Sequence, residues 1–564
     1  MRIAIALPIC FALVGCSPSG TPPAPSDAGL SDGDAGPPGA SCPDRAPPPD
    51  GARCQVTGGS AALLITATIL LPDGPLHGGQ VVVDGQGKIA CAGCDCSAQA
   101  AAAGATEVYC PSAVLSPGLI NAHDHITFQS APGFDSGERY EQRNDWRKGL
   151  RGHTKLSSGG TASTNLIRWA ELRMVMGGAT STVGSGGEAG LLRNLDKADP
   201  LQEGLAHKPV DYDTFPLGDS NGTQLSSGCG YPSPTGAGAI AADSAYFPHI
   251  AEGIDATARN EFVCVSMPGP YDLAQPQSAF IHSVGLEAAD YAAMAKDGVA
   301  LVWSPRSNMR LYGDTARVTE AARFGALIAL GTDWLQSGSM NMLRELRCAD
   351  GLNRNYFGGY FEDRDLWRMA TANAASAAAM DDAIGAIKTG LVADLALFDG
   401  SQHADYRAVI EAAPADVILV MRGGRVLHGD RTIVEAIPGL AGACDVIDVC
   451  GSAKEVCLQH EIGMTLPALQ AATPGAYPLF FCDQPTNEPT CVPKRPKSVS
   501  GSTVYDGTPS ATDSDGDGIP DAMDDCPSVF NPIRPVDQGA QGDADGDGRG
   551  DACDPCPLTA GDSC

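Results

Sequence analysis

Eight short apolar runs recur along the middle of the chain, and each is followed by a polar or helix-like stretch. The first run ends at His123, and the others cover residues 178–183, 191–195, 210–215, 245–249, 279–282, 299–304 and 326–331. Apolar runs that alternate with helices indicate parallel strands, and eight such units are typical of a closed barrel. We therefore predict an α/β fold, a (β/α)8 TIM barrel over residues 116–385. The clearest helices are expected at residues 288–296, 315–324 and 341–348; a helix-like segment covers 165–176, and an Ala-rich helix is expected at 366–380.

Further β-rich runs flank the barrel on both sides. They cover residues 63–70 and 80–84 before it, and 390–398, 417–421 and 425–427 after it. Val, Ile and Thr dominate these runs and turn residues separate them, which is the pattern of short strands. We predict a small β-sandwich built from residues 61–115 and 386–435 together.

The chain begins with the pattern of an export signal, over residues 1–16. Arg2 precedes an apolar run at 3–14, which is too short for a permanent membrane helix. Leu13-Val14-Gly15-Cys16 resembles the lipobox of bacterial lipoproteins, which implies lipidation of Cys16; an ordinary cleaved signal with a chance cysteine is the alternative. Ser17 resembles lipoproteins sent to the outer membrane. We expect an exported protein, lipid-anchored at the outer membrane or cell surface of a Gram-negative bacterium.

Composition adds a linker and an oxidising compartment. Residues 17–60 begin as a Pro-, Gly- and Ser-rich stretch, and we assign them to a flexible linker. Twenty cysteines favour disulfides, also for the crowded Cys91, Cys94, Cys96 and Cys110, although a metal cluster there stays open. Residues 436–510, rich in Pro, Thr and Cys, are expected to form disulfide-pinned loops. The net charge of −30 argues against a nucleic-acid partner.

Candidate chemistry starts at the end of the first apolar run. His123 and His125 stand one residue apart, and on a strand two such side chains point to the same face. They can therefore reach one metal ion. Taken alone the pair is weak evidence, because surface and packing histidines produce the same spacing.

Three later apolar runs end in similar residues. His249 closes one run with Glu252 three residues on, His282 closes the next, and Asp333 follows the last. The carboxyl ends of barrel strands share one face, where active sites lie. Each residue also has an ordinary interpretation, since His282 can be a buried histidine, Glu252 a helix-start carboxylate and Asp333 a cap. Their common position favours a site for Zn²⁺ or a similar ion, with a position left for water.

This set resembles the amidohydrolase superfamily from about residue 61 to residue 429. The matching residues are Pro117–His125, His249 with Glu252, His282, Ser304-Pro305-Arg306-Ser307-Asn308, Gly331-Thr332-Asp333 and Gly390-Leu391-Val392-Ala393-Asp394. The His-x-x-Glu step and the Ser-Pro-Arg-Ser-Asn run look most like the mononuclear aminohydrolase and chlorohydrolase branch. Trp303, Arg306 and Asn308 either line the substrate pocket or serve packing and loop hydrogen bonds.

The resemblance assigns roles to the candidate residues. The implied ligands of one Zn²⁺ or Fe²⁺ are His123, His125, His249 and Asp333. Asp333 would take a proton from the attacking water, and Glu252 would pass a proton to the ring nitrogen and the leaving group. His282 would orient the resulting hydroxide and stabilise the tetrahedral intermediate.

The number of metal ions is indicated by one difference between this sequence and the binuclear members of the superfamily. Binuclear relatives carry a carboxylated lysine at the end of the fourth strand. The corresponding run at residues 209–215 contains no Lys, and Lys208 stands at its wrong end. We therefore expect one metal ion.

The last segment, residues 511–564, carries two copies of an acidic repeat. The candidate calcium ligands are Asp513, Asp515, Asp517, Asp521, Asp524, Asp543, Asp545, Asp547 and Asp551. Carboxylates at alternating positions, with Gly at the turns, supply the oxygen ligands that Ca²⁺ prefers. The repeats resemble thrombospondin type 3 repeats; a merely solvated acidic tail is the alternative. We expect the repeats and the barrel to be independent, so that calcium removal leaves the hydrolase active.

The expected function is hydrolysis of a C–N bond other than a peptide bond, through deamination or ring-amide cleavage of a small heterocycle. One alternative is a binuclear amidase or peptidase-like enzyme of the same superfamily, and another is an inactive calcium-dependent adhesion protein. The second alternative is disfavoured because every expected site residue is present. Expected partners are a small-molecule substrate and a membrane, through the lipid anchor; a homo-oligomer is left open.

Overall fold

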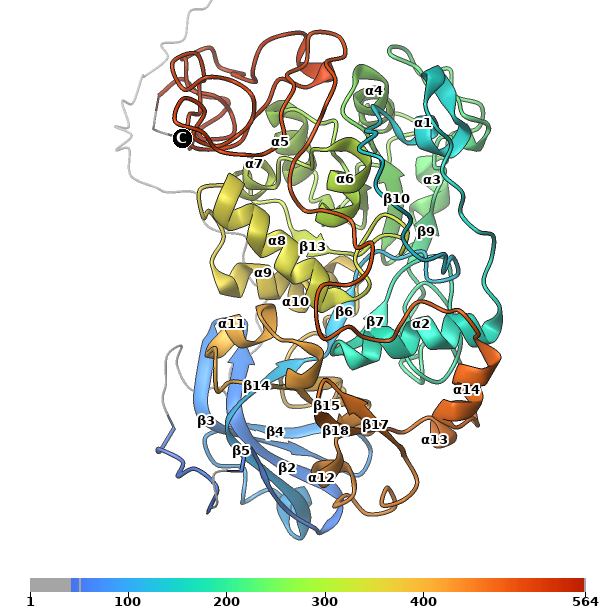
Figure 1. Ribbon diagram of the computed structural model, residues 1–564, viewed down its shortest axis with the longest axis vertical. Helices are drawn as coiled ribbons and strands as arrows, with labels where there is room; N and C mark the ends of the chain where they lie inside the picture. The colour runs from blue at the N-terminus through green and yellow to red at the C-terminus, as the bar shows by residue number, and fades with distance from the viewer. Residues whose placement is uncertain (1–41, 50–51, 562–563) are drawn as a thin grey trace, which may run out of the picture.

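The computed structural model describes residues 42–49, 52–561 and 564. A ring of strands and helices occupies the centre of the molecule, and a large sheet packs at one end of it (Figure 1). The C-terminal segment, drawn in red, runs along the helical body to the opposite end. The predicted signal and the lipidation site Cys16 lie outside the described residues. Among the described residues, no helix is long and apolar enough to cross a membrane.

Eight parallel strands form two sheets. The first contains β6 (Leu119–Asn121), β7 (Ala179–Thr182) and β8 (Arg193–Asn194), and the second contains β9 (Asp211–Asp213), β10 (Tyr246–Ile250), β11 (Ala279–His282), β12 (Ala300–Trp303) and β13 (Ile328–Leu330). Backbone hydrogen bonds span both gaps between the sheets. Val210 N donates to Leu195 O at 2.9 Å, and Ala122 N donates to Leu330 O at 3.0 Å. These bonds close the ring, and each of the eight predicted runs overlaps one of its strands.

Small and branched side chains fill the interior of the ring. Ile120, Phe247, Ile281, Val302 and Ala329 come from different strands and belong to one buried cluster. Their alternation with outward-facing residues follows from the two-residue repeat of a strand. The barrel is therefore packed below the strand ends, which leaves the carboxyl ends free to carry the site.

Ten helices of the described chain accompany the barrel, most of them on its outside, whereas the first and the sixth lie beside the carboxyl ends of the strands. They are α1 (Arg143–Lys148), α2 (Thr164–Met176), α3 (Ala237–Ile240), α4 (Ala256–Val265), α5 (Ala288–Lys296), α6 (Pro305–Tyr312), α7 (Val318–Arg323), α8 (Met342–Tyr356), α9 (Asp363–Met369) and α10 (Ala372–Ala377). The prediction of one helix over 366–380 is wrong, because the chain breaks between α9 and α10. Thr371 has φ −137° and ψ −99°, and its hydroxyl donates to Trp367 O at 2.9 Å. A threonine side chain that bonds the backbone in this way competes with helix continuation.

Ten strands form one mixed sheet beside the barrel. They are β1 (Gln55–Thr57), β2 (Ser60–Leu71), β3 (Gly74–Val83), β4 (Ile89–Gly93), β5 (Ala105–Pro117), β14 (Leu395–Asp399), β15 (Val417–Arg422), β16 (Arg425–Asp430), β17 (Asp445–Val449) and β18 (Ser452–Val456). Their order is β17-β18-β16-β15-β14-β5-β2-β3-β4, with β1 paired to β5. Segments before and after the barrel thus meet at β5 and β14, as predicted. Hydrogen bonding makes the unit one continuous sheet, where two packed sheets were expected.

Two boundaries differ from the sequence prediction. Order begins before residue 61, because β1 and two disulfides, Cys42–Cys94 and Cys54–Cys110, already involve residues assigned to the flexible linker. Beyond residue 436, β17 and β18 extend the sheet where only loops were expected. The remaining helices are α11 (Asp405–Ile410), α12 (Arg431–Val434), α13 (Gln459–Ile462) and α14 (Leu466–Ala472).

Disulfides join the predicted cysteine-rich regions. Besides the two already named, the pairs are Cys91–Cys96, Cys229–Cys264, Cys348–Cys491, Cys444–Cys457, Cys450–Cys482, Cys526–Cys553 and Cys556–Cys564. The crowded cysteines near residue 91 are therefore bonded to one another or to neighbours, as predicted. The Cys348–Cys491 bond fixes the C-terminal extension to α8.

Candidate metal centre and active site

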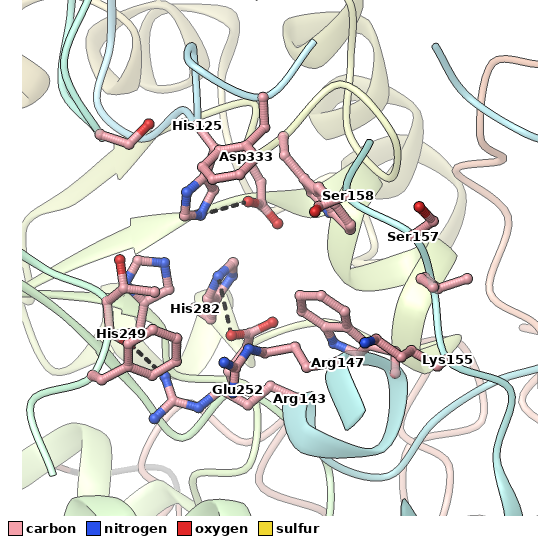
Figure 2. Close-up of a pocket in the computed structure, with 17 residues that line it drawn as sticks. His125, Arg143, Arg147, Lys155, Ser157, Ser158, His249, Glu252, His282 and Asp333 are labelled. Carbon is pink, nitrogen blue, oxygen red and sulfur yellow. Dashed lines mark hydrogen bonds and ion pairs between the residues drawn. The ribbon is translucent and has the colours of Figure 1, made fainter. Parts of the chain in front are cut away.

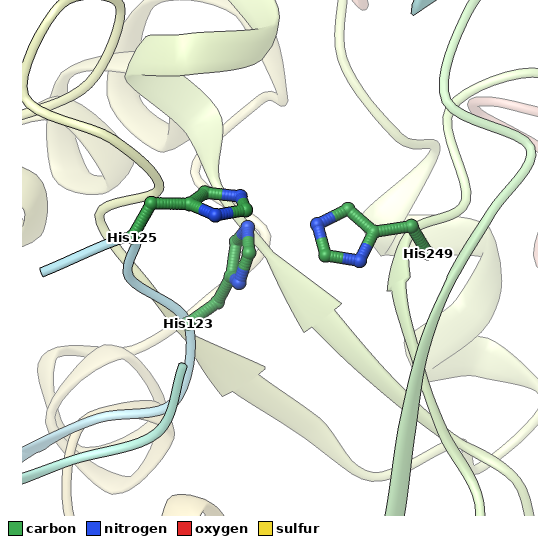
Figure 3. A group of neighbouring side chains, drawn as sticks. All are labelled: His123, His125 and His249. Atoms are coloured by element: carbon green, nitrogen blue, oxygen red, sulfur yellow. The ribbon is translucent and has the colours of Figure 1, made fainter. Parts of the chain in front are cut away.

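Three histidines converge at the carboxyl ends of the barrel strands (Figure 3). His123 and His125 follow β6 and His249 lies on β10, and one ring nitrogen of each lies within 4.8 Å of the others. His249 Nε2 is buried and has no hydrogen-bond partner among the residues that the structure describes. A buried imidazole nitrogen left without a partner is costly in water-free surroundings, so a bound cation accounts for it. The cluster fits a divalent metal ion.

Asp333 and His282 complete the cluster from two other strands. Asp333 follows β13, and its Oδ1 lies 3.2 Å from His123 Nε2 and 3.5 Å from His125 Nε2. Both residues have left-handed backbone conformations, with φ 73° at His282 and 57° at Asp333. Such conformations are unfavourable for residues other than glycine and are concentrated at functional sites. The strand ends are shaped to aim these side chains inward.

Burial sets the charge of the site. Desolvation, followed by the neighbouring histidines, lowers the pKa of His249 well below its usual value. Burial likewise lowers the pKa of His282 to about 3 and that of His125 to about 4. For Asp333, burial opposes ionisation, but contact with His123 and the other imidazoles holds its pKa well below the usual range. Neutral imidazoles and an ionised carboxylate are the forms that bind a metal ion.

The pKa of Glu252 is shifted in the opposite direction to that of Asp333. Its side chain is buried, and burial raises its pKa to about 8. Tyr312 donates a hydrogen bond to its Oε1 at 2.7 Å, and its Oε2 lies 3.8 Å from His282 Nε2. A carboxyl group that holds its proton near neutral pH, next to an ionised Asp333, is suited to proton donation.

Side chains of helix α6 form hydrogen bonds with the site residues. Ser307 donates to Asp333 Oδ2 at 2.6 Å, and Asn308 Nδ2 lies 3.2 Å from His282 Nδ1. Together with Tyr312, the helix therefore contacts three of the predicted site residues. This explains the Ser-Pro-Arg-Ser-Asn run as a positioning element.

Trp303 and Arg306 are not among the residues that line the cavity. Trp303 Nε1 donates to Thr315 at 2.7 Å, and Arg306 Nε donates to Ser339 at 2.6 Å. Of the two interpretations given to these residues, packing and loop hydrogen bonds is the one that the structure bears out.

Tyr212 is a site residue that the sequence did not reveal. It lies on β9, the fourth barrel strand, and its hydroxyl is 3.4 Å from His123 Nδ1 and 3.4 Å from His125 Nε2. Burial raises the pKa of Tyr212 well above its usual value, so its phenol is neutral. Tyrosine is common in strands, and only closure of the barrel brings this one to the histidines.

The site opens into a cavity of about 690 Å³ (Figure 2). Its inner end is lined by His125, His249, Glu252, His282 and Asp333. The rest of the wall comes from α1, from the loop that follows it and from aromatic side chains. The volume is that of a typical small-molecule site.

Two arginines of the C-terminal extension, residues 436–564, form hydrogen bonds with elements next to the site. Arg495 donates to Tyr140 O at 3.0 Å, to Tyr312 O at 2.7 Å and to Glu141 Oε1 at 2.6 Å. Arg534 donates to Val284 O and Leu286 O, both at 3.0 Å, in the loop that follows His282. Both guanidinium groups are buried, with 3% and 5% of the residue surface exposed. The extension thus contacts both α6 and the end of β11.

The acidic repeats form two loops with the same internal bonds. Asp513 accepts from Gly516 N at 2.7 Å and from Gly518 N at 3.0 Å, and Asp543 accepts from Gly546 N and Gly548 N at 2.9 and 3.0 Å. The structure forms two clusters of three carboxylates each. The first contains Asp513, Asp515 and Asp517, and the second contains Asp543, Asp545 and Asp547. The other predicted ligands, Asp521, Asp524 and Asp551, lie outside these two groups; Asp521 and Asp551 accept hydrogen bonds from Ser514 N and Ala544 N instead.

A barrel with imidazoles and a carboxylate at its carboxyl strand ends defines a TIM-barrel protein with a divalent-metal centre. Residues 244–427 match the model of the amidohydrolase family, and residues 511–534 match that of the thrombospondin type 3 repeat. The second half of the barrel is therefore similar to the amidohydrolase family, and the start of the acidic segment is similar to a thrombospondin type 3 repeat.

Individual relatives are similar over part of their length. A 5-methylthioadenosine/S-adenosylhomocysteine deaminase of Pelotomaculum thermopropionicum is 34% identical over 163 residues, which are 27% of this chain and 37% of that protein. The enzyme of the same description from Desulforudis audaxviator is 32% identical over 170 residues, covering 27% of this chain and 40% of that protein. The chain therefore spans about two fifths of the length of these relatives.

Solved structures cover more of the chain at lower identity. The atrazine chlorohydrolase TrzN from Arthrobacter aurescens TC1, complexed with zinc, aligns at a TM-score of 0.49 and 19% identity, over 65% of this chain and 95% of that one. An adenosine deaminase from Xanthomonas campestris with bound zinc aligns at 0.47 and 18% identity, over 73% of this chain and 96% of that one.

Proposed function

We propose that this protein is a metal-dependent hydrolase that cleaves a C–N bond, other than a peptide bond, in a small heterocycle. The observation that carries the proposal is the pair of buried carboxyl groups in one cavity. The surroundings of Glu252 raise its pKa to about 8, whereas those of Asp333 lower its pKa. Two titratable groups with opposed proton affinities at a metal cluster are the acid and the base that hydrolysis needs. The deaminase relatives support the same reaction class.

Each site residue has its own role in the proposed reaction. A bound metal ion supplies Lewis acidity, which lowers the pKa of water at the site. Asp333 accepts a proton from the attacking water at a carboxylate oxygen. Glu252 delivers its proton to the ring nitrogen and recovers one from the added hydroxyl group as the carbonyl forms, while Tyr312 holds its orientation through the 2.7 Å hydrogen bond. As the C–N bond breaks, the proton held by Asp333 passes to the leaving amine, which departs as ammonia. His282, fixed by Asn308, aligns the water for attack.

We propose zinc as the ion and one ion per chain. Imidazole and carboxylate ligands suit Zn²⁺, and Fe²⁺ is the second choice. The absence of lysine in the fourth strand sequence and the position of Tyr212 support a single ion, and they argue against the binuclear amidase alternative.

We further propose calcium at the C-terminal repeats and export with lipidation at Cys16. Asp515 Oδ2 is buried without a hydrogen-bond partner among the described residues, and the thrombospondin type 3 match covers this loop. Nine disulfides in the described chain support an oxidising compartment. Anchoring at an outer membrane or cell surface follows from the lipobox.

An ammonia-release screen tests the proposed reaction. The zinc-loaded full chain is incubated with adenosine derivatives, other purines, pyrimidines, triazines and cyclic amides. We expect turnover of at least one class, and loss of about a thousandfold or more in kcat for Glu252→Gln. The surface variant Asp483→Asn is the control. If no compound releases ammonia, or if Glu252→Gln is as active as the control, the proposed reaction is wrong.

A further inference from the structure

The wall of the cavity opposite the histidines is rich in cations and donors. Figure 2 places Lys155, Ser157 and Ser158 on the far side from His249, and Arg143 and Arg147 near Glu252. Such a wall is unexpected in a chain whose net charge is −30. Positive side chains gathered in a cavity of an acidic protein indicate a ligand of opposite charge.

The cations of this wall differ in whether a nearby carboxylate neutralises their charge. Arg143 is neutralised, because its guanidinium lies 2.7 Å from Asp219 and 3.7 Å from Glu261. Arg147 instead packs over the ring of Phe215, with its central carbon 4.2 Å from the ring centroid, and it donates to the neutral Asn144.

Neither Arg147 nor Lys155 forms an ion pair or a hydrogen bond with a carboxylate in the described part of the chain, although Asp219 and Glu252 act on Arg147 at longer range. Two cations without counter-ions therefore face the cavity. Because both belong to α1 and the loop after it, one short stretch of sequence supplies the charge.

An independent observation points in the same direction. Trp334 Nε1 is a buried donor on the cavity wall, and it has no hydrogen-bond partner within the described chain. A buried donor without an acceptor is unfavourable, and an acceptor on a ligand would satisfy it. The Trp334 indole also stacks on Trp146, with ring centroids 5.2 Å apart and planes inclined by 30°. The two indoles offer an apolar edge beside the donors.

We propose that the substrate carries an oxyanion, a carboxylate or a phosphate, at the end remote from the bond that is cleaved, and that Arg147 and Lys155 bind it. The planar part of the substrate then lies between this wall and Glu252, beside the stacked indoles. Trp334 Nε1 supplies a further donor. The inference rests on the proposed function, because Glu252 and Asp333 define the reacting end.

Matched ligands test the inference by isothermal titration calorimetry on the zinc-loaded full chain. One set is adenosine-5′-carboxylate, adenosine 5′-phosphate and the neutral adenosine-5′-carboxamide; the other is orotate and orotamide. We expect at least one anion to bind tenfold or more tightly than its amide, as for a charge-assisted hydrogen bond. The tighter anion of the adenosine set identifies carboxylate or phosphate. If no anion binds, or if every amide binds as well as its anion, the proposal is overturned.

Variants assign the preference to the two cations. We expect Arg147→Gln and Lys155→Met each to reduce the anion preference at least threefold, and Arg147→Lys to retain most of it. Arg364→Gln, at a half-buried cation, and Lys388→Met, at an exposed one, lie outside the cavity lining and should leave it unchanged. Lys155 is itself exposed, so Lys155→Met is a test even if the Arg147 variants fail to fold. An unchanged preference in Lys155→Met and in every folded Arg147→Gln sample overturns the proposal.

The two proposals can fail separately. Anion-selective binding without ammonia release from any compound would leave the oxyanion subsite and remove the proposed reaction. Ammonia release with equal binding of anions and amides would do the reverse.

Discussion

Glu252 and Asp333 are both buried carboxyl groups at strand ends, yet their surroundings act on them in opposite directions. Asp333 lies among imidazole nitrogens, which favour its charged form. For Glu252, burial outweighs the opposing charge of Arg143, and Asp333 and Glu261 act in the same direction as burial, so its pKa rises to about 8. The difference arises from neighbours a few ångströms away, because the two side chains are chemically almost identical.

Glu171 on α2 shows the same effect of burial outside the active site. Its Oε1 accepts from Glu188 N at 2.8 Å and from Asn194 at 3.1 Å, and burial raises its pKa to about 8. Because the folded-state pKa lies above that of the unfolded chain, the folded protein retains the proton between pH 4.5 and 8. Its contribution to stability is fully present below pH 4.5 and is lost as the pH rises through about 8.

Glu171→Gln should remove this pH dependence. We expect the melting temperature of the natural protein to fall between pH 5 and 9 by about 2 °C or more beyond the fall in Glu171→Gln. Thermal unfolding followed by circular dichroism at several pH values measures the difference. Parallel curves for the two proteins would mean that Glu171 does not titrate in this range.

The six residues at strand ends could be predicted from the sequence, since each stands where an apolar run stops. These are His123, His125, His249, Glu252, His282 and Asp333. Tyr212, Tyr312 and Trp334 could not, because aromatic residues in strands and helices usually serve packing. Only the closed barrel shows that Tyr212 contacts the histidines, that Tyr312 contacts Glu252 and that Trp334 lines the cavity.

At the scale of elements, α6 links the site to the rest of the molecule. Its inner face contacts Asp333, His282 and Glu252, and its last residue accepts a hydrogen bond from Arg495. The strands and helices around it could be predicted from the periodicity of apolar residues along the chain. The split between α9 and α10 was not, because it depends on one threonine, Thr371, that bonds the backbone.

Arg495→Ala should loosen α6. The change removes the partner of Glu141 Oε1 and of two buried carbonyl oxygens, while Glu141 Oε2 keeps its contact with His153, so we expect a loss of about 3 kcal/mol in the free energy of unfolding. Amide exchange within Pro305–Tyr312 should accelerate at least tenfold. Arg425→Ala, at a side chain that is 59% exposed, is the matched control. Exchange in α6 that equals the control would show that Arg495 does not hold the helix.

At the scale of the whole molecule, the acidic repeats are part of the folded body. Phe530 N donates to Tyr356 O at 2.9 Å, and Arg317 donates to Pro532 O at 3.3 Å. With Arg534 bound in the loop after His282, the repeats contact the barrel through buried groups. The expectation of independent modules is therefore revised. The sequence could not reveal this, because repeat motifs carry no information on what they pack against.

Calcium removal should destabilise the barrel as well as the repeats. Without a cation, the carboxylates of the two loops repel one another, and Arg534 loses its rigid support. We expect EGTA, with zinc resupplied afterwards, to lower the melting temperature of the main transition by about 5 °C. Asp517→Asn should reproduce part of this shift without a chelator, whereas Asp483→Asn should not. A main transition that is unaffected by EGTA would restore the view of independent modules.

The central claim is that one metal ion at the histidine cluster enables C–N hydrolysis, and a zinc titration tests it most directly. Metal-free protein in saturating calcium is titrated with zinc, and the initial rate of ammonia release from the best compound is recorded at each step. The account predicts a linear rise that stops at one ion per chain, and no rise in His249→Ala. A rise that continues to two ions, or equal activity in His249→Ala, would contradict it.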